Sequence, residues 1–128
     1  MDFKKLANQY RYELLDNVLP FWLEHSQDLE FGGYFTCLDR EGKVFHTDKF
    51  IWLQGREVWM FSMLYNKVEK RQEWLDCAVQ GGEFLKKYGH DGNYNWYFSL
   101  DRSGRPLVEP YNIFSYTFAT MAFGQLSL

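Results

Sequence analysis

The stretch from residue 49 to residue 65, KFIWLQGREVWMFSMLY, constrains the fold of this chain more than any other. It has the length of a helix and few polar positions in its interior, so a helix formed from it is apolar on nearly every face. Such a helix is buried on most sides and needs several other elements packed around it. The sequence therefore predicts a largely helical domain with this segment near its centre.

Arg56 lies in the middle of this segment. An arginine stays charged, so it has to face a carboxylate, a water-filled cavity or a ligand. Trp52 and Trp59 lie about one turn to either side, and Met63 continues the same face. A cation between aromatic rings suits the wall of a site for a sugar or another polar ring. An arginine paired with an acid inside the core is the alternative interpretation.

Apolar periodicity and turn residues predict four helices and two short β-hairpins. Pro20 is expected to kink or break the first helix near Asn17. Asp2 is a candidate cap for this helix, and Thr47 or Asp48 is a candidate cap for the second. Two glycines inside the third helix predict that another helix packs closely there. The expected helices cover about 3–24, 49–66, 72–88 and 111 or 112 to 126, and the expected strands cover 34–38, 44–45, 94–100 and 107–108.

One turn occurs twice. LDREGK at 38–43 is matched by LDRSGR at 100–105, which lies 62 positions further along and in the same context of helix, hairpin and helix. The chain therefore divides into two helix-hairpin-helix units, about 1–66 and 67–128. Repeated units share a core by stacking, and usually at least three are needed for stability. We expect residues 1–128 to be the N-terminal portion of one larger helical toroid domain.

Composition excludes several classes of protein. The formal net charge is −3 and the basic residues are scattered, so we expect no nucleic-acid partner. No apolar run reaches the roughly 18 residues needed to cross a bilayer, and the charged start is unlike a signal peptide, which predicts a cytoplasmic protein. Isolated cysteines and dispersed histidines predict free thiols, no metal site and no cofactor; these residues are Cys37, Cys77, His25, His46 and His90.

The motifs FWLEHS at 21–26, GGYFTCLDR at 32–40 and KFIWLQGR at 49–56 resemble the N-terminal part of the N-acylglucosamine 2-epimerase family. GGEFLKKY, LDRSGRP and IFSYTFATMAFGQL follow in the expected order, so the resemblance covers essentially the whole chain. It implies an all-α fold that is part of an (α/α)6 barrel, with the sugar in the central cavity and both hairpins toward one end. It also implies interconversion of N-acetylglucosamine and N-acetylmannosamine by deprotonation and reprotonation at C2.

The same resemblance implies roles for three residues. Arg56 is expected to hydrogen-bond the oxygens of the sugar, Trp52 to stack on the sugar, and Tyr111 to lie at the mouth of the cavity. The family's two catalytic histidines lie in its C-terminal half and match none of the histidines here, so we expect negligible activity from this chain alone. Ser115 and Tyr116 stand where the family has an acid, or serine followed by an acid, after the IFS motif.

Two alternatives stay open. The chain can be a non-catalytic binding or assembly module, in which self-association covers apolar flanks and places Arg56 at an interface; we expect a homo-oligomer, and three copies would supply twelve helices. A glycoside hydrolase on the same toroid would need two paired carboxylates. Glu57, Glu83 and Glu109 are available, but nothing in the sequence places two of them together.

Overall fold

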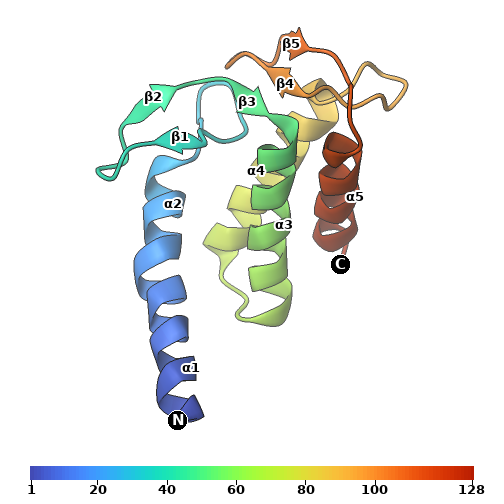
Figure 1. Ribbon diagram of the computed structural model, residues 1–128. Helices are drawn as coiled ribbons and strands as arrows, with labels where there is room; N and C mark the ends of the chain where they lie inside the picture. The colour runs from blue at the N-terminus through green and yellow to red at the C-terminus, as the bar shows by residue number, and fades with distance from the viewer.

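The computed structural model describes residues 1–128 and shows helices standing side by side, with all the strands gathered at one end (Figure 1). The helical elements are α1 (Phe3–Tyr12), the π-helix η1 (Glu13–Val18), α2 (Leu19–His25), α3 (Ile51–Lys67), α4 (Gln72–Tyr88) and α5 (Phe114–Leu126). The strands are β1 (Cys37–Leu38), β2 (Val44–His46), β3 (Lys49–Phe50), β4 (Ser99–Leu100) and β5 (Pro106–Val108). Because α1, η1 and α2 form one continuous rod, the four predicted helices are present.

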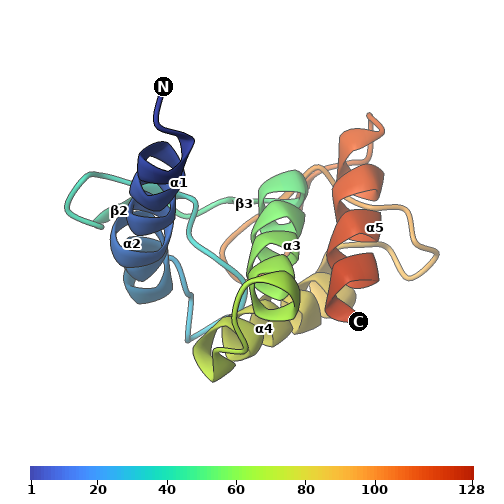
Figure 2. The same ribbon diagram turned by 90° about the horizontal axis from the view of Figure 1, so that it is seen from below.

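Helix α3 occupies the centre of the molecule, as predicted from its apolar sequence. Seen along the helices, α4 and α5 pack directly against it, whereas the rod formed by α1, η1 and α2 stands to one side (Figure 2). The buried core is built mainly from α3, α4 and the inner face of α5, with Tyr34 inserted from the loop between α2 and β1. One face of α3 is therefore less covered than the others.

The first helix follows the prediction at its start and differs from it in the middle. The side chain of Asp2 accepts hydrogen bonds from the backbone N–H groups of Lys4 and Lys5 and caps the helix. Of the kink or break predicted near Asn17, the break does not occur, because the chain continues to His25; the regular α-helix is instead interrupted at this position by the π-helical turn η1. The N–H of Leu19 donates to the carbonyl of Leu14, five residues earlier, and this wider turn accommodates Pro20, which has no N–H to donate.

The predicted cap of the central helix is also wrong. Neither Thr47 nor Asp48 caps α3, which begins at Ile51. Lys49 and Phe50 instead form strand β3, which pairs with β4 and joins the three-stranded sheet β3-β4-β5. The backbone stays extended here because the sheet supplies its partners: the N–H of Ile51 donates to the carbonyl of Phe98. This sheet connects the first half of the chain to the second.

Strands β1 and β4 are shorter than predicted, whereas β2 and β5 each extend one residue beyond the predicted 44–45 and 107–108. Strand β1 covers two residues of the predicted 34–38, and β4 covers two of the predicted 94–100. Helix α5 begins at Phe114 rather than at 111 or 112. The antiparallel pairings β1-β2 and β4-β5 confirm both hairpins.

Two glutamine side chains take the place of a strand partner for the backbone at Gly33 and Tyr34. The Gln54 amide, on α3, accepts from the N–H of Tyr34 and donates to its carbonyl, both at 2.8 Å. The Gln80 amide, on α4, does the same for Gly33 at 2.5 and 3.0 Å. Gly81 has no room for a Cβ atom because the Tyr34 ring lies against it. The prediction that a helix packs on the glycine pair therefore holds for only one of the two glycines. Helix α5 approaches Gly82, whereas Gly81 is contacted by Tyr34.

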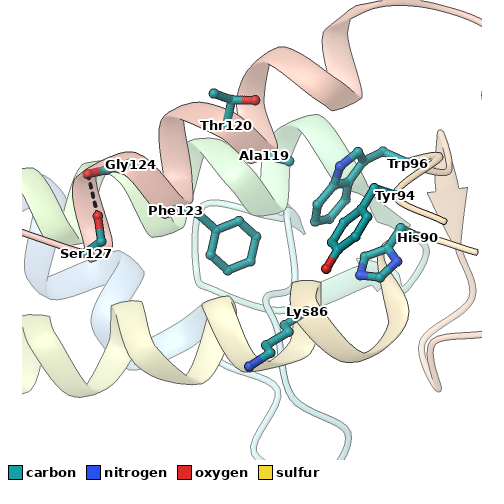
Figure 3. Close-up of a pocket in the computed structure, with 9 residues that line it drawn as sticks. All are labelled: Lys86, His90, Tyr94, Trp96, Ala119, Thr120, Phe123, Gly124 and Ser127. Carbon is teal, nitrogen blue, oxygen red and sulfur yellow. Dashed lines mark hydrogen bonds between the residues drawn. The ribbon is translucent and has the colours of Figure 1, made fainter. Parts of the chain in front are cut away.

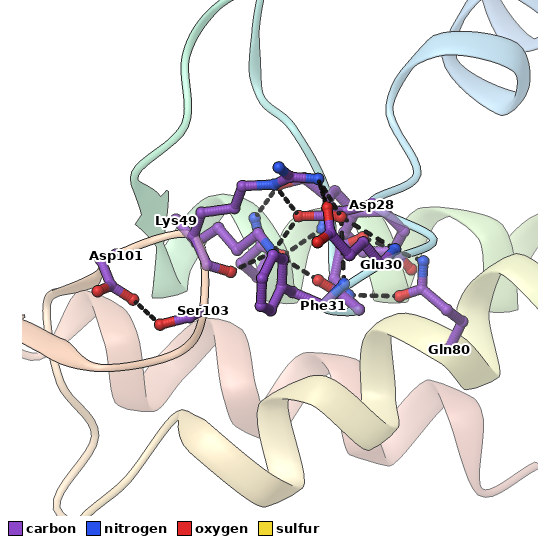
Figure 4. Close-up of polar contacts among 12 residues, drawn as sticks. Asp28, Glu30, Phe31, Lys49, Gln80, Asp101 and Ser103 are labelled. Atoms are coloured by element: carbon purple, nitrogen blue, oxygen red, sulfur yellow. Dashed lines mark hydrogen bonds and ion pairs between the residues drawn. The ribbon is translucent and has the colours of Figure 1, made fainter.

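A buried carboxylate joins three segments near the strands (Figure 4). Asp28 is fully buried, and Lys49 Nζ lies 2.9 Å from its Oδ2. Arg102 completes the cluster with two hydrogen bonds of 2.9 and 3.0 Å to the two oxygens of Asp28. Burial alone would raise the pKa of Asp28, but the hydrogen bonds from Arg102 and Lys49 lower it to about 2. Such bidentate, charge-assisted contacts are the strong class of hydrogen bond.

The two copies of the repeated turn have the same local structure. Asp39 and Asp101 each accept hydrogen bonds from backbone N–H groups of the turn that follows. Gly42 and Gly104 both have left-handed φ, +84° and +94°, and each packs on the ring of the last residue of the preceding helix. Glycine is needed at both positions because of this φ and this close approach. The division into units of about 1–66 and 67–128 stays a prediction.

Replacing Asp28 by asparagine should destabilise the fold strongly. The Asp28→Asn variant leaves the Lys49 ammonium buried without its anion, which costs about 3–5 kcal/mol in free energy of unfolding. Urea denaturation of the variant and the parent chain measures this. Glu30→Gln is the matched control, because Glu30 pairs with the same Arg102 from an exposed position and should change the free energy by less than about 1 kcal/mol. Equal effects from the two variants would show that the buried ion pair contributes no more to stability than the exposed one.

Candidate functional site

Arg56 lies on the less covered face of α3, together with the half-buried side chains of Trp52, Trp59 and Met63. The helical face predicted from their spacing is therefore the least covered face of α3, and of its four residues Met63 also packs against the core. Arg56 is exposed and forms no ion pair, so the alternative of an acid partner inside the core does not hold. Its guanidinium carbon lies 5.6 Å from the centroid of the Trp52 ring and 5.8 Å from that of Phe118, on α5. The cation is thus flanked by two aromatic rings and has no counter-ion.

An aromatic hollow of about 310 Å³ lies beside this cation. It is lined by Trp52 from α3, by Phe114 and Phe118 from α5, and by Phe98, which precedes β4. Tyr111 is largely exposed, and its ring packs on that of Phe98 at 4.8 Å between centroids. The structure therefore brings Arg56 and Trp52 into contact distance and connects Tyr111 to them through Phe98. Sequence reasoning missed Phe98 and Phe114 as wall residues because both resemble ordinary core positions.

A second, smaller cavity of about 210 Å³ lies on the α2 side of Arg56. Its walls come from α3, from the rod η1-α2 and from the residue before β1: Val18, Trp22, Thr36, Leu53, Arg56, Glu57 and Met60. Most of these side chains are apolar. Two hydrogen-bonding groups, one from Thr36 and one from Glu57, accompany the cation.

Glu57 is a buried acid next to Arg56 in the chain. The side chain is almost inaccessible to solvent, and its one hydrogen bond is donated by the Ser26 hydroxyl, 2.5 Å from Oε1. Burial raises the pKa of Glu57 to about 8, and the hydrogen bond from Ser26 opposes this only in part. Desolvation disfavours the charged form of a carboxyl group, so Glu57 is protonated at neutral pH. An acid in the middle of a helix expected to be buried on most sides was the sequence signal that could have singled it out.

The largest hollow, about 730 Å³, lies elsewhere, between α4 and α5 (Figure 3). The His90 ring stacks on that of Tyr94, with 4.9 Å between centroids, and Tyr94 has a left-handed φ of +63°. Lys86 and Phe123 also line it. None of these residues lines either hollow beside Arg56, so this hollow is separate from them despite its size.

The histidines do not join Arg56. His25 lies beneath the first repeated turn, against Gly42, and His46 lies 3.6 Å from Asp48 on an exposed strand. No three potential metal ligands of the His, Cys, Asp and Glu types come together, and Cys37 and Cys77 are free thiols. Arg56 and its aromatic neighbours are therefore the best-defined candidate site.

Comparison with known proteins decides the family. The sequence pattern of the family described as N-acylglucosamine 2-epimerase (GlcNAc 2-epimerase) matches residues 33–128. The chain belongs to this family. It is 49% identical over 116 residues to the N-acylglucosamine 2-epimerase of Mus musculus, an alignment that covers 88% of this chain and 28% of the mouse protein. It is 29% identical over 120 residues to the cellobiose 2-epimerase of Dictyoglomus turgidum, covering 92% of this chain and 30% of that relative.

Solved structures confirm the fold class. The cellobiose 2-epimerase from Bacillus thermoamylovorans superposes with a TM-score of 0.86 at 28% identity, over 96% of this chain and 32% of the other. That from Spirochaeta thermophila gives a TM-score of 0.84 at 21% identity, over 96% and 30%. The prediction of an all-α fold that forms part of an (α/α)6 barrel is confirmed. The chain spans less than a third of the length of the relatives it matches.

Glu57 should make the stability of this chain depend on pH. Between the unfolded pKa of about 4.3 and the folded value of about 8, the folded chain keeps a proton that the unfolded chain has released. Stability therefore falls as pH rises through this window, by at most about 1.4 kcal/mol per pH unit, and levels off above it. Denaturation of the parent chain and Glu57→Gln across the window checks this.

The Glu57→Gln variant should not show this loss of stability with rising pH, because its amide does not titrate. Glu83→Gln, which changes an exposed glutamate on α4, should retain it. A parent chain and a Glu57→Gln variant with parallel stability profiles would show that Glu57 is ionised in the folded state.

Proposed function

We propose that this chain contributes part of the substrate site of a sugar 2-epimerase that interconverts N-acetylglucosamine and N-acetylmannosamine. The observation that carries the proposal is the Arg56 guanidinium, which has no counter-ion in this chain and lies near both the Trp52 and the Phe118 ring, beside an aromatic hollow. Membership of the family and the name of the mouse relative support the choice of reaction. Planar, fixed donors beside flat apolar rings suit a sugar, which has hydroxyl groups at its edges and C–H groups on its faces.

Each predicted site residue has a role in this proposal. Arg56 hydrogen-bonds the carbonyl oxygen or a hydroxyl group of the open-chain sugar. Trp52 stacks on the carbon skeleton, and Phe118, which packs on Trp52, provides a second ring near the guanidinium. Tyr111, packed on Phe98 and exposed, lies at the mouth of the site.

The chemistry explains why an arginine is useful here. Removal of the C2 proton places negative charge on the neighbouring carbonyl oxygen, and a fixed cation that faces this oxygen stabilises the charge as it develops. The proton is then returned to the opposite face of C2, which needs acid-base groups within hydrogen-bond reach. The histidines of this chain line neither hollow beside Arg56. We propose that these groups come from outside residues 1–128 and that this chain alone has negligible epimerase activity.

A second candidate, self-association, is favoured by the rod formed by α1, η1 and α2. This rod exposes a row of large apolar side chains: Phe3, Leu6, Tyr10, Leu14 and Val18 are between 36% and 73% exposed. Apolar surface of this kind marks contact sites in soluble proteins. A homo-oligomer would cover it, with the chain acting as a binding or assembly module.

The oligomer is expected to appear as a mass above that of a single chain in light scattering at micromolar concentration. Leu6→Glu combined with Leu14→Glu should return it to the monomer, because charge on this row opposes apolar contact. A parent chain that is already monomeric would contradict self-association. The matched control is Val108→Glu, on β5, which is exposed at the opposite end of the helices.

The cellular compartment of the protein is also a proposal. No helix is both long enough and apolar enough to cross a membrane. Two free thiols fit a reducing compartment. We therefore propose that the protein works in the cytoplasm.

Replacing Arg56 tests the proposed sugar site. Arg56→Ala should weaken binding of N-acetylmannosamine by about tenfold or more, since hydrogen bonds from charged groups contribute about 1.5–3 kcal/mol. Titration followed by the NMR signal of the Trp52 indole N–H measures the affinity. Arg40→Ala, which removes an exposed cation from the first repeated turn, should bind as the parent chain does.

Exchange of the C2 proton with D2O, followed in the same samples, should stay at the background rate for the parent chain. Turnover by residues 1–128 would show that the acid-base groups are present in this chain after all. Sugar binding that is indifferent to Arg56 would overturn the proposed site.

A further inference from the structure

The smaller cavity beside Arg56 contains hydrogen-bonding groups that have no partner, or only one, within this chain. Thr36 Oγ1 is buried and has no hydrogen-bond partner. Glu57 is 7% exposed, and only its Oε1 is engaged, by the Ser26 hydroxyl. Nearly all buried polar groups in folded proteins have partners. Two incompletely paired groups on the wall of one cavity, next to an uncompensated cation, indicate that a ligand supplies the missing partners.

The surroundings of Glu57 determine what kind of partner it needs. From α2 it is faced by the Ser26 hydroxyl, and on α3 its neighbour Arg56 forms no ion pair with it. Tyr34 and Cys77 are the other titratable groups near it, and burial raises the pKa of both, so they remain neutral. Glu57 therefore keeps its proton at neutral pH, and its second oxygen presents an O–H donor.

We propose that Thr36 and Glu57, together with Arg56, form a hydrogen-bonding subsite for an uncharged, hydroxyl-bearing arm of the sugar. This inference rests on the proposed function and assigns two further ligands to the same site. The hydroxyl, carboxyl and guanidinium groups of these residues can all donate hydrogen bonds, and the hydroxyl and carbonyl oxygens of a sugar can accept them. Trp22, Leu53 and Met60 supply apolar wall for the C–H groups of the same arm.

The volume of the cavity limits the ligand that fits. At about 210 Å³ it is smaller than the roughly 300–1,000 Å³ of pockets that enclose a whole drug-sized ligand. It is therefore sized for a small group rather than a large ligand, and in this proposal it takes one arm of the sugar while the aromatic hollow on the other side of Trp52 takes the rest. The cation at the boundary of the two spaces contacts the sugar between them.

The experiment measures N-acetylmannosamine binding to the 128-residue chain by NMR titration. Thr36→Val has the same shape without the hydroxyl group and should weaken binding about three- to tenfold, the effect of one lost neutral hydrogen bond. Thr36→Ser restores the hydroxyl and should recover the affinity. Thr47→Val, on an exposed connection, is the matched control and should leave the affinity unchanged. The amide spectrum of each variant verifies that it is folded.

Glu57 is tested by the pH dependence of binding. Between about pH 7 and pH 9 the parent chain should lose affinity, because ionisation removes the O–H donor. The Glu57→Gln variant keeps an N–H donor that does not titrate, so its binding should not weaken over this range. Saturating sugar should also raise the pKa of Glu57, since the ligand binds the protonated form.

The outcomes separate this inference from the proposed function. If the sugar shifts the Trp52 indole signal and Arg56→Ala weakens binding, while Thr36→Val binds like the parent chain and binding does not depend on Glu57, the subsite is wrong and the proposed function stands. If neither N-acetylmannosamine nor N-acetylglucosamine shifts any signal of Arg56, Trp52 or Thr36, both are wrong. Loss of affinity in Thr36→Val with recovery in Thr36→Ser supports the subsite.

Discussion

The buried carboxylate of Asp28 is the interaction on which the arrangement of the candidate site depends. It lies in the loop that follows α2 and binds Lys49, which precedes α3, and Arg102, in the turn between β4 and β5. Lys49 also donates to the backbone carbonyls of Gly32 and Arg102. A single anion therefore joins three segments that are far apart in sequence. A buried carboxylate remains charged only if its loss of hydration is compensated. Here the two cations and their hydrogen bonds provide that compensation.

This cluster explains how the site residues reach their places. Fixing Lys49 fixes the start of α3, and Trp52 and Arg56 follow within the first two turns. The loop that contains Asp28 continues into Gly33 and Tyr34, where the glutamine side chains of α3 and α4 hold the backbone, and then reaches Thr36. The sheet β3-β4-β5 keeps Phe98 beside Trp52. The aromatic hollow and the smaller cavity thus share one structural support, although their walls come from distant parts of the chain.

The sequence predicted what depends on local periodicity and on repeated turns. The helix at 72–88, the cap at Asp2, both hairpins and the exposed aromatic face with Arg56 follow from spacing alone. It did not predict strand β3, because two residues adopt that conformation only when β4, fifty positions later, pairs with them. It did not predict that Asp28, Lys49 and Arg102 meet, nor that Phe98 and Phe114 line the site. These features are long-range contacts, and no short pattern encodes them.

Arg56 and Glu57 are neighbours, and the protonation state of Glu57 determines whether the charge of Arg56 is free to contact a ligand. Consecutive helical residues point about 100° apart, so Arg56 faces the aromatic rings while Glu57 points toward Ser26, which directly follows α2. If Glu57 were ionised, an anion in a poorly solvated cavity beside Arg56 would compete with any ligand for that cation. Because burial keeps Glu57 neutral, the charge of Arg56 is left uncompensated by the protein. In the proposed epimerisation at C2, the oxygen atom that becomes negative would then meet a cation that has no other partner in this chain, which is how a fixed charge stabilises a transition state.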